Sequence, residues 1–282
     1  MVDGAVVFAG GGLAGIAWEL GVMLGLEDAE PGLLDRLLDP RTTFVGTSAG
    51  SAVASQIAGG TPLEDLYAVQ LAEETAELGA TLDLEALGAT FAELMVGATS
   101  PEEMRRRVGA FSAQALTVPA DDRRAVIAAR LPNQDWSTRR LLITAVDTAT
   151  GELRIFDRDS GVDLVDAVAA SCAVPGVWPP VPIEGALYMD GGVRSIANAD
   201  LAVGADRVLV LVPAADVPGA GSVPEAEIAA LAPAEVLVAY ADEASLAAFG
   251  ANALDPAIRP AAAMAGREQG RALAPQVAAF WR

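Results

Sequence analysis

Residues 44–51, FVGTSAGS, predict a strand, a tight turn and the start of a helix. The first two residues are apolar and end the strand, and residues 49–57 are small and apolar enough for a closely packed helix. Ser48 lies on the bend in the pattern G-x-S-x-G, which is typical of a nucleophile exposed between a strand and a helix. Gly46 and Gly50 leave room beside it. The same pattern also fits a small-residue turn that only packs a helix against a sheet.

The bases that usually accept a proton from serine are missing from this chain. It contains no histidine, and each of its 18 basic residues is an arginine. Imidazole and the lysine amine are therefore excluded as general bases. If Ser48 is a nucleophile, its base must be a carboxylate.

A second strand, loop and helix precede the serine turn. Residues 5–9, AVVFA, form a short apolar run, and residues 15–26 show the helical spacing of apolar side chains. Between them lie three glycines, Gly10, Gly11 and Gly12, whose amides are not shielded by side chains. Such amides can bind a carbonyl oxygen that becomes negatively charged.

The same loop also fits the G-x-G-x-x-G pattern of a dinucleotide-binding turn, with Gly15 as its last glycine. That interpretation needs an acidic residue at the end of a second strand. The acids at a suitable spacing, Asp28, Glu30 and Asp35, lie instead in sequence typical of a helix or loop. The dinucleotide-binding site is therefore the weaker of the two interpretations.

Strands alternate with helices along the rest of the chain. Residues 63–130 are rich in Ala, Leu and Glu and predict several helices that form a lid or cap. Further on, apolar runs predict strands over residues 141–146, 153–156, 207–212 and 235–240, and helices are expected over 163–171 and 256–281. This order predicts an α/β fold with a mostly parallel sheet covered on both faces. No repeat or linker divides the chain, so a single domain is expected over residues 1–282.

A third motif, Asp190-Gly191-Gly192, is by itself a common turn. Two motifs precede it in the chain: the triple-glycine loop after the first strand and the G-x-S-x-G turn. The three motifs in this order resemble those of the patatin-like phospholipase family. Residues 143–153, ITAVDTATGEL, and 169–181, AASCAVPGVWPPV, resemble that family as well. The resemblance implies a three-layer α/β/α sandwich with a helical insert at about residues 63–130.

Carried over to this sequence, the resemblance assigns a role to each motif. It implies a Ser-Asp dyad with Ser48 as nucleophile and Asp190 as base, and an oxyanion hole formed by Gly10, Gly11 and Gly12. The glycines that support these motifs are Gly15, Gly46, Gly50, Gly191 and Gly192. The family commonly has Arg or Lys before the last glycine of the first loop, where this chain has Ala14. The resemblance therefore implies ester hydrolysis more directly than a phospholipid substrate.

The function implied by the resemblance is hydrolysis of acyl ester bonds in lipids, either phospholipids or neutral lipids and other carboxylic esters. Two alternatives stay open: an acyltransferase that uses the same dyad, and the dinucleotide-binding protein. We expect no cofactor and no metal, because the spacings of His and Cys that bind metals are absent. The expected partner is a lipid or other acyl ester, with transient contact to a membrane or micelle left open.

Charge and composition limit the other partners and the compartment. The net charge of -20 disfavours nucleic acid, because phosphate binding needs clustered cations. The single cysteine, Cys172, cannot form an internal disulfide and is expected to be a small buried side chain in a cytoplasmic protein. Residues 42–63 carry no charge, but glycines and Pro62 interrupt them, so we expect a buried strand and helix rather than a membrane span. No signal peptide is visible, and secretion by another route is left open.

Overall fold

The computed structural model describes residues 3–80, 84–217 and 221–282. Its described strands form one eight-stranded sheet in the order β5-β6-β3-β2-β1-β7-β8, with β4 paired to β3 outside this order. The strands are β1 (Gly4–Phe8), β2 (Thr43–Thr47), β3 (Leu141–Asp147), β4 (Leu153–Phe156), β5 (Val181–Ile183), β6 (Ala186–Asp190), β7 (Arg207–Val212) and β8 (Glu235–Tyr240).

The centre of the sheet is parallel. Strands β3, β2, β1, β7 and β8 pair with one another in parallel, whereas β4, β5 and β6 are antiparallel to their partners. All five residues of β1 are buried, which explains its uninterrupted apolar run, because a central parallel strand is covered on both faces. The expected mostly parallel sheet is confirmed.

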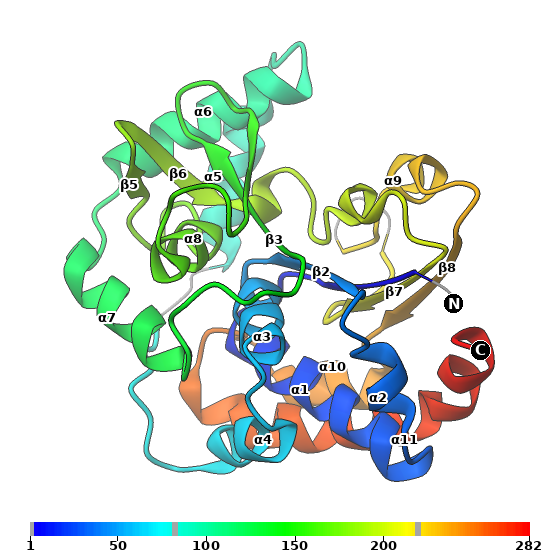
Figure 1. The fold of residues 1–282 in the computed structure, drawn as a ribbon. Helices are drawn as coiled ribbons and strands as arrows, with labels where there is room; N and C mark the ends of the chain where they lie inside the picture. Colours follow the sequence, from blue (N-terminus) through cyan, green and yellow to red (C-terminus); the bar gives the residue numbers. More distant parts are fainter. Residues whose placement is uncertain (1–2, 81–83, 218–220) are drawn as a thin grey trace.

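One face of the sheet carries most of the described helices, including the two longest. Phe8, Phe44 and Leu209 contribute to a large core on this side. Figure 1 shows α1, α4, α10 and α11 below the sheet. The helices that contribute to this core are α1 (Gly12–Ala29), α2 (Leu33–Leu37), α3 (Ala49–Ala58), α4 (Leu63–Leu71), α7 (Ala120–Arg130), α8 (Leu164–Ser171), α10 (Glu243–Phe249) and α11 (Arg259–Phe280), with η3 (Pro256–Ile258) leading into α11.

The opposite face is covered by fewer of the described helices. Val7, Val45 and Leu142 pack there with Ala197 and Ala199 in a second core. Figure 1 shows α9 above the sheet near β8 and the α5–α6 pair near β6. The elements of this layer are α5 (Leu84–Met95), α6 (Pro101–Gln114), η1 (Gly191–Val193), η2 (Ala199–Ala202) and α9 (Glu225–Ala230). Helices on both faces confirm the expected three-layer α/β/α fold.

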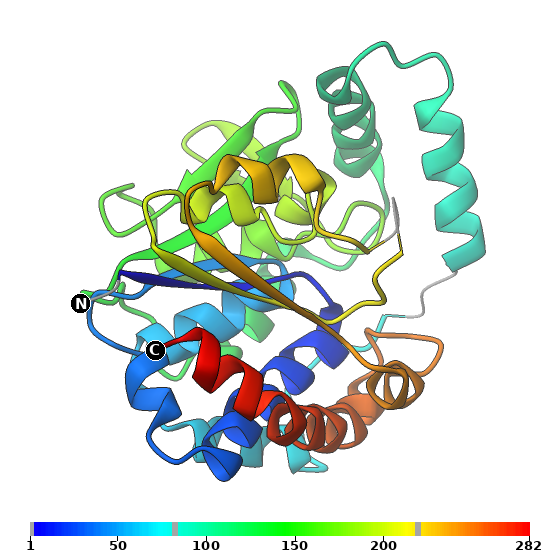
Figure 2. The same cartoon turned by 90° about the vertical axis from the view of Figure 1, so that its right-hand side faces the viewer.

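The helical region expected over residues 63–130 is present as α4, α5, α6 and α7. Figure 2 shows α5 and α6, in cyan and teal, as a pair that stands away from the sheet. Strands β5 and β6 were not expected from the sequence, which contains several prolines there and a turn at Glu184-Gly185 with positive φ at both residues. Within the described ranges, no helix combines the length and hydropathy needed to cross a membrane.

Candidate active site

Ser48 lies on a strained bend between β2 and α3. Its φ of 53° and ψ of −120° are unusual for a residue with a side chain, and such backbone strain typically costs about 1–3 kcal/mol. The bend is tight because small residues surround it. A Cβ atom at Gly50 would overlap the carbonyl of Phe8, and one at Gly46 would overlap the backbone of Ser51. Both glycines are therefore required by close backbone crossings.

Side chains from two helices hold the backbone of Ser48 in this conformation. The Ser48 N–H donates to Oγ of Ser171 in α8 at 2.9 Å. The Ser48 carbonyl accepts from Oγ of Ser51 at 2.6 Å and from Sγ of Cys172 at 3.1 Å. Burial raises the pKa of Cys172, so this side chain stays a neutral thiol. Cys172 is buried and small, as expected, and it also helps to fix the bend.

The pairing of the strands explains how Asp190 reaches Ser48. Strand β2 pairs with residues 141–144 of β3, β6 with residues 145–147, and β4 with residues 143–146. Each residue of a strand has only two edges, so β4 occupies one edge of β3 while β2 and β6 share the other. Because β6 is antiparallel to β3, the carboxyl ends of β2 and β6 meet. Ser48 follows the end of β2, and Asp190 is the last residue of β6.

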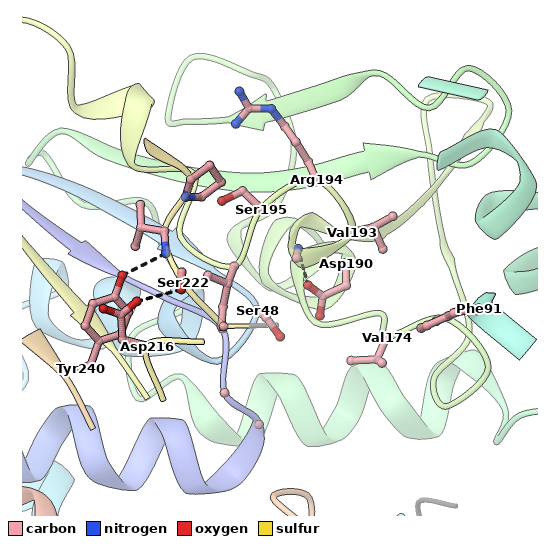
Figure 3. A pocket seen from close by; sticks show the side chains of 18 of the residues that line it. Ser48, Phe91, Val174, Asp190, Val193, Arg194, Ser195, Asp216, Ser222 and Tyr240 are labelled. Atoms are coloured by element: carbon pink, nitrogen blue, oxygen red, sulfur yellow. Dashed lines mark hydrogen bonds between the residues drawn. The ribbon is translucent and has the colours of Figure 1, made fainter. Parts of the chain in front are cut away.

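Asp190 is a buried carboxylate with one free oxygen. It is 4 % exposed, and its Oδ1 accepts from the Gly192 N–H at 2.7 Å. Its Oδ2 has no hydrogen-bond partner in the described part of the chain. Burial raises the pKa of Asp190 to about 6, while the Ser48 hydroxyl, the Gly192 N–H and the charge of Arg123 act to lower it. Figure 3 shows the side chains of Ser48 and Asp190 together at the base of a cavity.

A buried amide ties the end of β6 to β2 and β3. Nδ2 of Asn198 donates to Thr47 Oγ1 at 3.1 Å, to the Gly191 carbonyl at 3.3 Å and to the Ser195 carbonyl at 2.9 Å. Thr47 Oγ1 also bonds to Oγ1 of Thr144 at 2.9 Å. Gly191 fits against Thr144 only because it has no Cβ atom. This network positions the loop that begins at Asp190.

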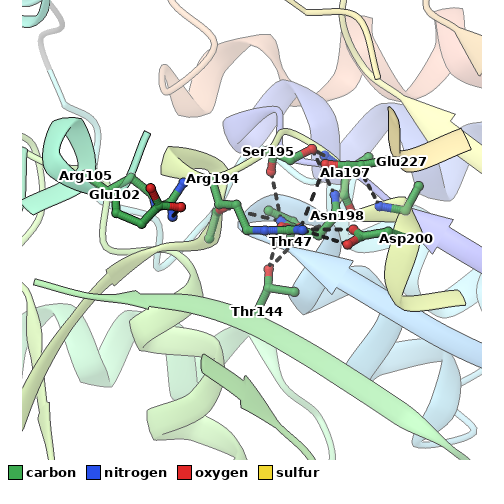
Figure 4. A network of polar contacts seen from close by, with 12 residues as sticks. Thr47, Glu102, Arg105, Thr144, Arg194, Ser195, Ala197, Asn198, Asp200 and Glu227 are labelled. Carbon is green, nitrogen blue, oxygen red and sulfur yellow. Dashed lines mark hydrogen bonds and ion pairs between the residues drawn. The ribbon is translucent and has the colours of Figure 1, made fainter. Parts of the chain in front are cut away.

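An ion pair fixes the same loop from the side of the solvent. Arg194 donates to both carboxylate oxygens of Asp200, at 3.0 and 2.6 Å, and to Oδ1 of Asn198 at 2.7 Å (Figure 4). Glu227 of α9 accepts from the Ala199 N–H at 2.8 Å. These contacts connect α9 to the loop after Asp190. Neither Asn198 nor Arg194 was predicted, because Asn198 bonds to the distant Thr47 and neither residue belongs to one of the three motifs.

The three glycines of the first loop do not have equivalent amides. The Gly10 N–H donates to the Ile196 carbonyl at 2.8 Å, so it is already occupied. The N–H groups of Gly11 and Gly12 have no acceptor among the described residues. Gly12 has a φ of +65° and begins α1. Of the three glycines predicted to form the oxyanion hole, Gly10 therefore borders Ser48 with its N–H already bonded, whereas Gly11 and Gly12 keep theirs available among the described residues.

The remaining residues of this loop pack tightly. Gly11 and Gly15 both face Pro213, where a Cβ atom on either would come close to the proline ring. Ala14 is fully buried, and its N–H donates to the Ala253 carbonyl at 3.1 Å. Ala14, which stands where the family commonly has Arg or Lys, thus holds the glycine loop against Ala253, which precedes α11.

Two cavities meet at Ser48. The larger has a volume of about 1090 Å³ and contains Asp190, Phe91 and the amide-bearing glycines in its wall. The smaller has a volume of about 180 Å³ and extends under α7. Ser48, Gly12 and Val174 border both. In the described ranges, no group of three or more His, Cys, Asp or Glu side chains could hold a metal ion.

The model of one protein family, described as patatin-like phospholipase, matches residues 6–203. The chain belongs to this family. The match includes the glycine loop, the Ser48 turn and the Asp190 turn, and it confirms the resemblance noted in the sequence. Membership of the patatin-like phospholipase family implies lipid acyl hydrolase activity in general terms.

Two solved structures that align with this chain are of longer proteins. VipD from Legionella pneumophila aligns with a TM-score of 0.46 and 14% identity, over 98% of this chain and 67% of VipD. The type III effector ExoU aligns with a TM-score of 0.44 and 16% identity, over 98% of this chain and 53% of ExoU. This chain thus spans about two thirds of VipD and about half of ExoU. A search of curated proteins found no match.

Proposed function

We propose that this protein is a serine hydrolase that cleaves acyl ester bonds of lipids through a dyad of Ser48 and Asp190. One observation carries the proposal: a buried carboxylate oxygen without a protein partner lies beside a serine on a strained strand-to-helix bend. Such an oxygen can accept the serine proton. The family match supports the class of substrate.

In the proposed reaction, Asp190 takes the proton from the Ser48 hydroxyl as Oγ attacks the ester carbonyl. The proton then passes from Asp190 to the departing alcohol, which leaves an acyl group on Ser48. Water then attacks this acyl-enzyme while Asp190 accepts its proton, and the bond between the acyl carbon and Ser48 Oγ breaks to release the fatty acid. The proton passes from Asp190 to Ser48 Oγ, which restores the starting state of the dyad. The pKa of about 6 makes Asp190 a better base than an exposed aspartate, yet leaves it ionised at neutral pH.

The negative charge that develops on the carbonyl oxygen needs hydrogen-bond donors. We assign this role to the N–H groups of Gly11 and Gly12, because both are free in the described structure and both border the cavity at Ser48. The N-terminus of α1 adds a favourable dipole at the same place. Gly10 contributes space beside Ser48 rather than a donor.

Replacement of the two dyad residues tests this function. Ser48→Ala and Asp190→Asn should each lower the turnover of p-nitrophenyl butyrate by a factor on the order of 10³ or more. Both variants should keep the fold, because each replacement is no larger than the native side chain. Asp159→Asn, which changes an acid outside the dyad whose side chain is 88% exposed, serves as the control for a general loss of charge. Full activity in either dyad variant would sink the assignment.

An acyltransferase with the same dyad remains the second candidate. The acyl-enzyme would then pass its acyl group to an alcohol in the wide cleft instead of water. The cleft has polar groups in its wall, among them Asp216, Ser222 and Tyr240 (Figure 3). Analysis of products formed in the presence of glycerol separates the two reactions, since only transfer yields an acylglycerol.

The dinucleotide-binding alternative loses its structural basis. It requires an acid at the end of the second strand, where β2 instead ends at Thr47 and is followed by Ser48. Asp28, one of the acids considered, forms ion pairs with Arg267 and Arg271 near the C-terminal end of α1, whereas the cavity lies at the N-terminal end, at Gly12.

We also propose that residues 1–282 act as one domain in transient contact with lipid surfaces. Strands β7 and β8 lie beyond the residues that the family model matches, yet β7 pairs with all five residues of β1 and so belongs to the same sheet.

The proposed contact with lipid surfaces is made by the tip of the α5–α6 pair. There, Met95 and Val96 are exposed, Val96 by 76%. Such exposed apolar side chains favour contact with a membrane. Val96→Asp should weaken co-sedimentation with phosphatidylcholine vesicles, and equal binding would exclude this tip.

A further inference from the structure

Arg123 of α7 is a buried cation that forms no ion pair within the described part of the chain. It is 5 % exposed, and its Nε and Nη1 have no hydrogen-bond acceptor among the described residues. The guanidinium lies over the ring of Trp178, with Cζ 3.9 Å from the ring centroid. Stacking on an aromatic face orients a guanidinium while its N–H groups stay free at the edge.

A second buried arginine on the same helix, Arg130, does have an acidic partner and serves as a comparison. Arg130 donates from Nε and Nη2 to the two carboxylate oxygens of Glu77, at 2.6 and 2.7 Å. This pair is buried as well. Both oxygens of Glu77 are therefore used by Arg130, and neither forms a hydrogen bond with Arg123.

Arg123 keeps its positive charge in this environment. Burial lowers the pKa of Arg123 to about 10, and the nearby charge of Arg130 acts in the same direction. A group with that pKa is still protonated at neutral pH. A buried charge without a counterion is destabilising, so an anion that enters the site is favoured.

The neighbouring groups do not supply that anion. Cys172 is a neutral thiol because burial raises its pKa, and Glu77 is paired with Arg130. Among the described residues, Asp190 accepts from the Gly192 N–H, and neither Nε nor Nη1 of Arg123 donates to it. Asp190 interacts with Arg123 only through the electrostatic field. Arg123 and Ser48 border a common space beside these residues.

That space is the smaller cavity, which contains both Ser48 and Arg123 in its wall. Most of the other wall residues are apolar, among them Leu13, Ile16 and Trp178. Its volume of about 180 Å³ is close to that of an apolar cavity of about 150 Å³ that holds one benzene molecule. It can therefore hold a phosphate, or a carboxylate with a few carbon atoms, but not a long acyl chain.

We propose that Arg123 binds a compact anionic group of the ester whose carbonyl lies at Ser48. This inference rests on the proposed hydrolase function and narrows its substrate to esters that carry a carboxylate or phosphate near the scissile bond. The anion has two sources: a phosphate on the alcohol side of the ester, or a carboxylate at the end of a short acyl group. In both cases charge-assisted hydrogen bonds from Arg123 would hold it.

Two pairs of matched esters test the proposal and distinguish the sources. Butyrylglycerol phosphate is compared with butyrylglycerol, and the p-nitrophenyl monoester of glutarate with p-nitrophenyl pentanoate. In at least one pair, the wild-type protein should prefer the anionic ester in kcat/KM, and Arg123→Gln should lower the anionic-to-neutral ratio on the order of 10- to 100-fold. A preference confined to the first pair assigns the phosphate, and one confined to the second assigns the carboxylate.

The adjacent Arg124 provides the matched control. Its side chain is 46% exposed and pairs with Asp166 at the surface. Arg124→Gln removes the same charge from the same helix and should leave the ratio unchanged. Equal ratios in wild-type protein and Arg123→Gln for both pairs would overturn the inference.

A binding measurement separates this inference from the hydrolase function. In Ser48→Ala, calorimetry should detect the preferred anionic ester with an affinity that falls at least 10-fold when Arg123→Gln is added. Binding that depends on Arg123, together with no turnover in wild-type protein, would leave the anion site standing and reject the hydrolase. Turnover in wild-type protein without binding that depends on Arg123 would do the opposite.

Discussion

Helices α3 and α5 both lie at the cavity that contains Ser48, but they are held in different ways. All ten residues of α3 are buried, and its backbone touches that of β1 at Gly50. None of the residues 86–95 of α5 is buried, and the helix contributes mainly Phe91 to the cavity wall. The comparison indicates that the reacting groups sit on fixed backbone, while the side of the cavity that meets the substrate is loosely packed.

The strongest test of this difference places a methyl group on α3. Gly50→Ala would drive a Cβ atom into the carbonyl of Phe8. Because two backbones must separate to make room, we expect a loss of about 3 kcal/mol or more in the free energy of unfolding. Urea unfolding followed by circular dichroism measures the change. A loss below about 1 kcal/mol would show that α3 is not held as closely as described.

Burial of Asp190, which lies beside Ser48 at the start of α3, also sets the pH range of the proposed activity. Since burial raises the pKa of Asp190 to about 6, the base becomes protonated below that pH. Well below that pH the rate should fall about tenfold per pH unit, which gives about a 50-fold loss between pH 6 and pH 4. The acid limb of kcat/KM for p-nitrophenyl butyrate gives this pKa directly. A limb near the ordinary aspartate value of ~3.9 would contradict the buried environment.

The same pKa has an opposite consequence for stability. The folded state of Asp190 holds its proton more tightly than the unfolded state, so the contribution of this group to stability falls as the pH rises from about 4 through about 6. Asp190→Asn cannot ionise and lacks this loss. It therefore serves as the control for the pH profile, with a flatter dependence of Tm on pH than the wild-type protein.

Truncation of the Phe91 side chain in α5 should lower activity toward some substrates more than it lowers the stability of the fold. Phe91 packs edge to face against Phe111, with ring centroids 6.3 Å apart, and borders the wide cavity. We expect Phe91→Ala to lower kcat/KM about 3- to 10-fold for esters with long acyl chains and less for butyrate, in line with about 1 kcal/mol of apolar contact. Leu116→Ala, at a fully exposed position, is the control. An equal effect on both chain lengths would exclude Phe91 from acyl binding.

The smallest effect is expected from the same substitution as in α3, made in α5. A Cβ atom at Gly88 would meet no described atom within 4 Å. Alanine has a higher helix propensity than glycine, so Gly88→Ala should stabilise the protein by about 0.5–1 kcal/mol. Opposite signs for Gly50→Ala and Gly88→Ala in parallel urea titrations would support the contrast between the two helices. If Gly50→Ala and Gly88→Ala both destabilised the protein, the contrast between α3 and α5 would be contradicted.

The sequence predicted those parts of the molecule that depend on local patterns. The apolar runs of β1, β2, β3, β7 and β8 and the three motifs predicted the parallel sheet, and the family match confirmed the resemblance that they carried. Strands β5 and β6 escaped prediction because they are short and carry Pro182 and a turn with positive φ. Their register comes from pairing with β3, which no local pattern contains.

The finer features of the site depend on contacts between distant segments. The bond from the Gly10 N–H to Ile196 removes one of three apparently equal glycines from the set of free amides. Likewise, Arg123 looks like any surface arginine in the sequence DDRR, and only the fold places it on Trp178 in a cavity with Ser48. Such features follow from which backbone and side-chain groups meet after folding, so motifs alone do not predict them.

The most direct test of the central claim is covalent labelling of Ser48. A fluorophosphonate should react with the folded wild-type protein, and mass spectrometry of the digested protein should place a single phosphonyl group on Ser48. The reaction should slow strongly in Asp190→Asn, because the serine then lacks its base. An unlabelled Ser48 in folded wild-type protein, or labelling at the same rate in Asp190→Asn, would contradict the Ser48–Asp190 dyad.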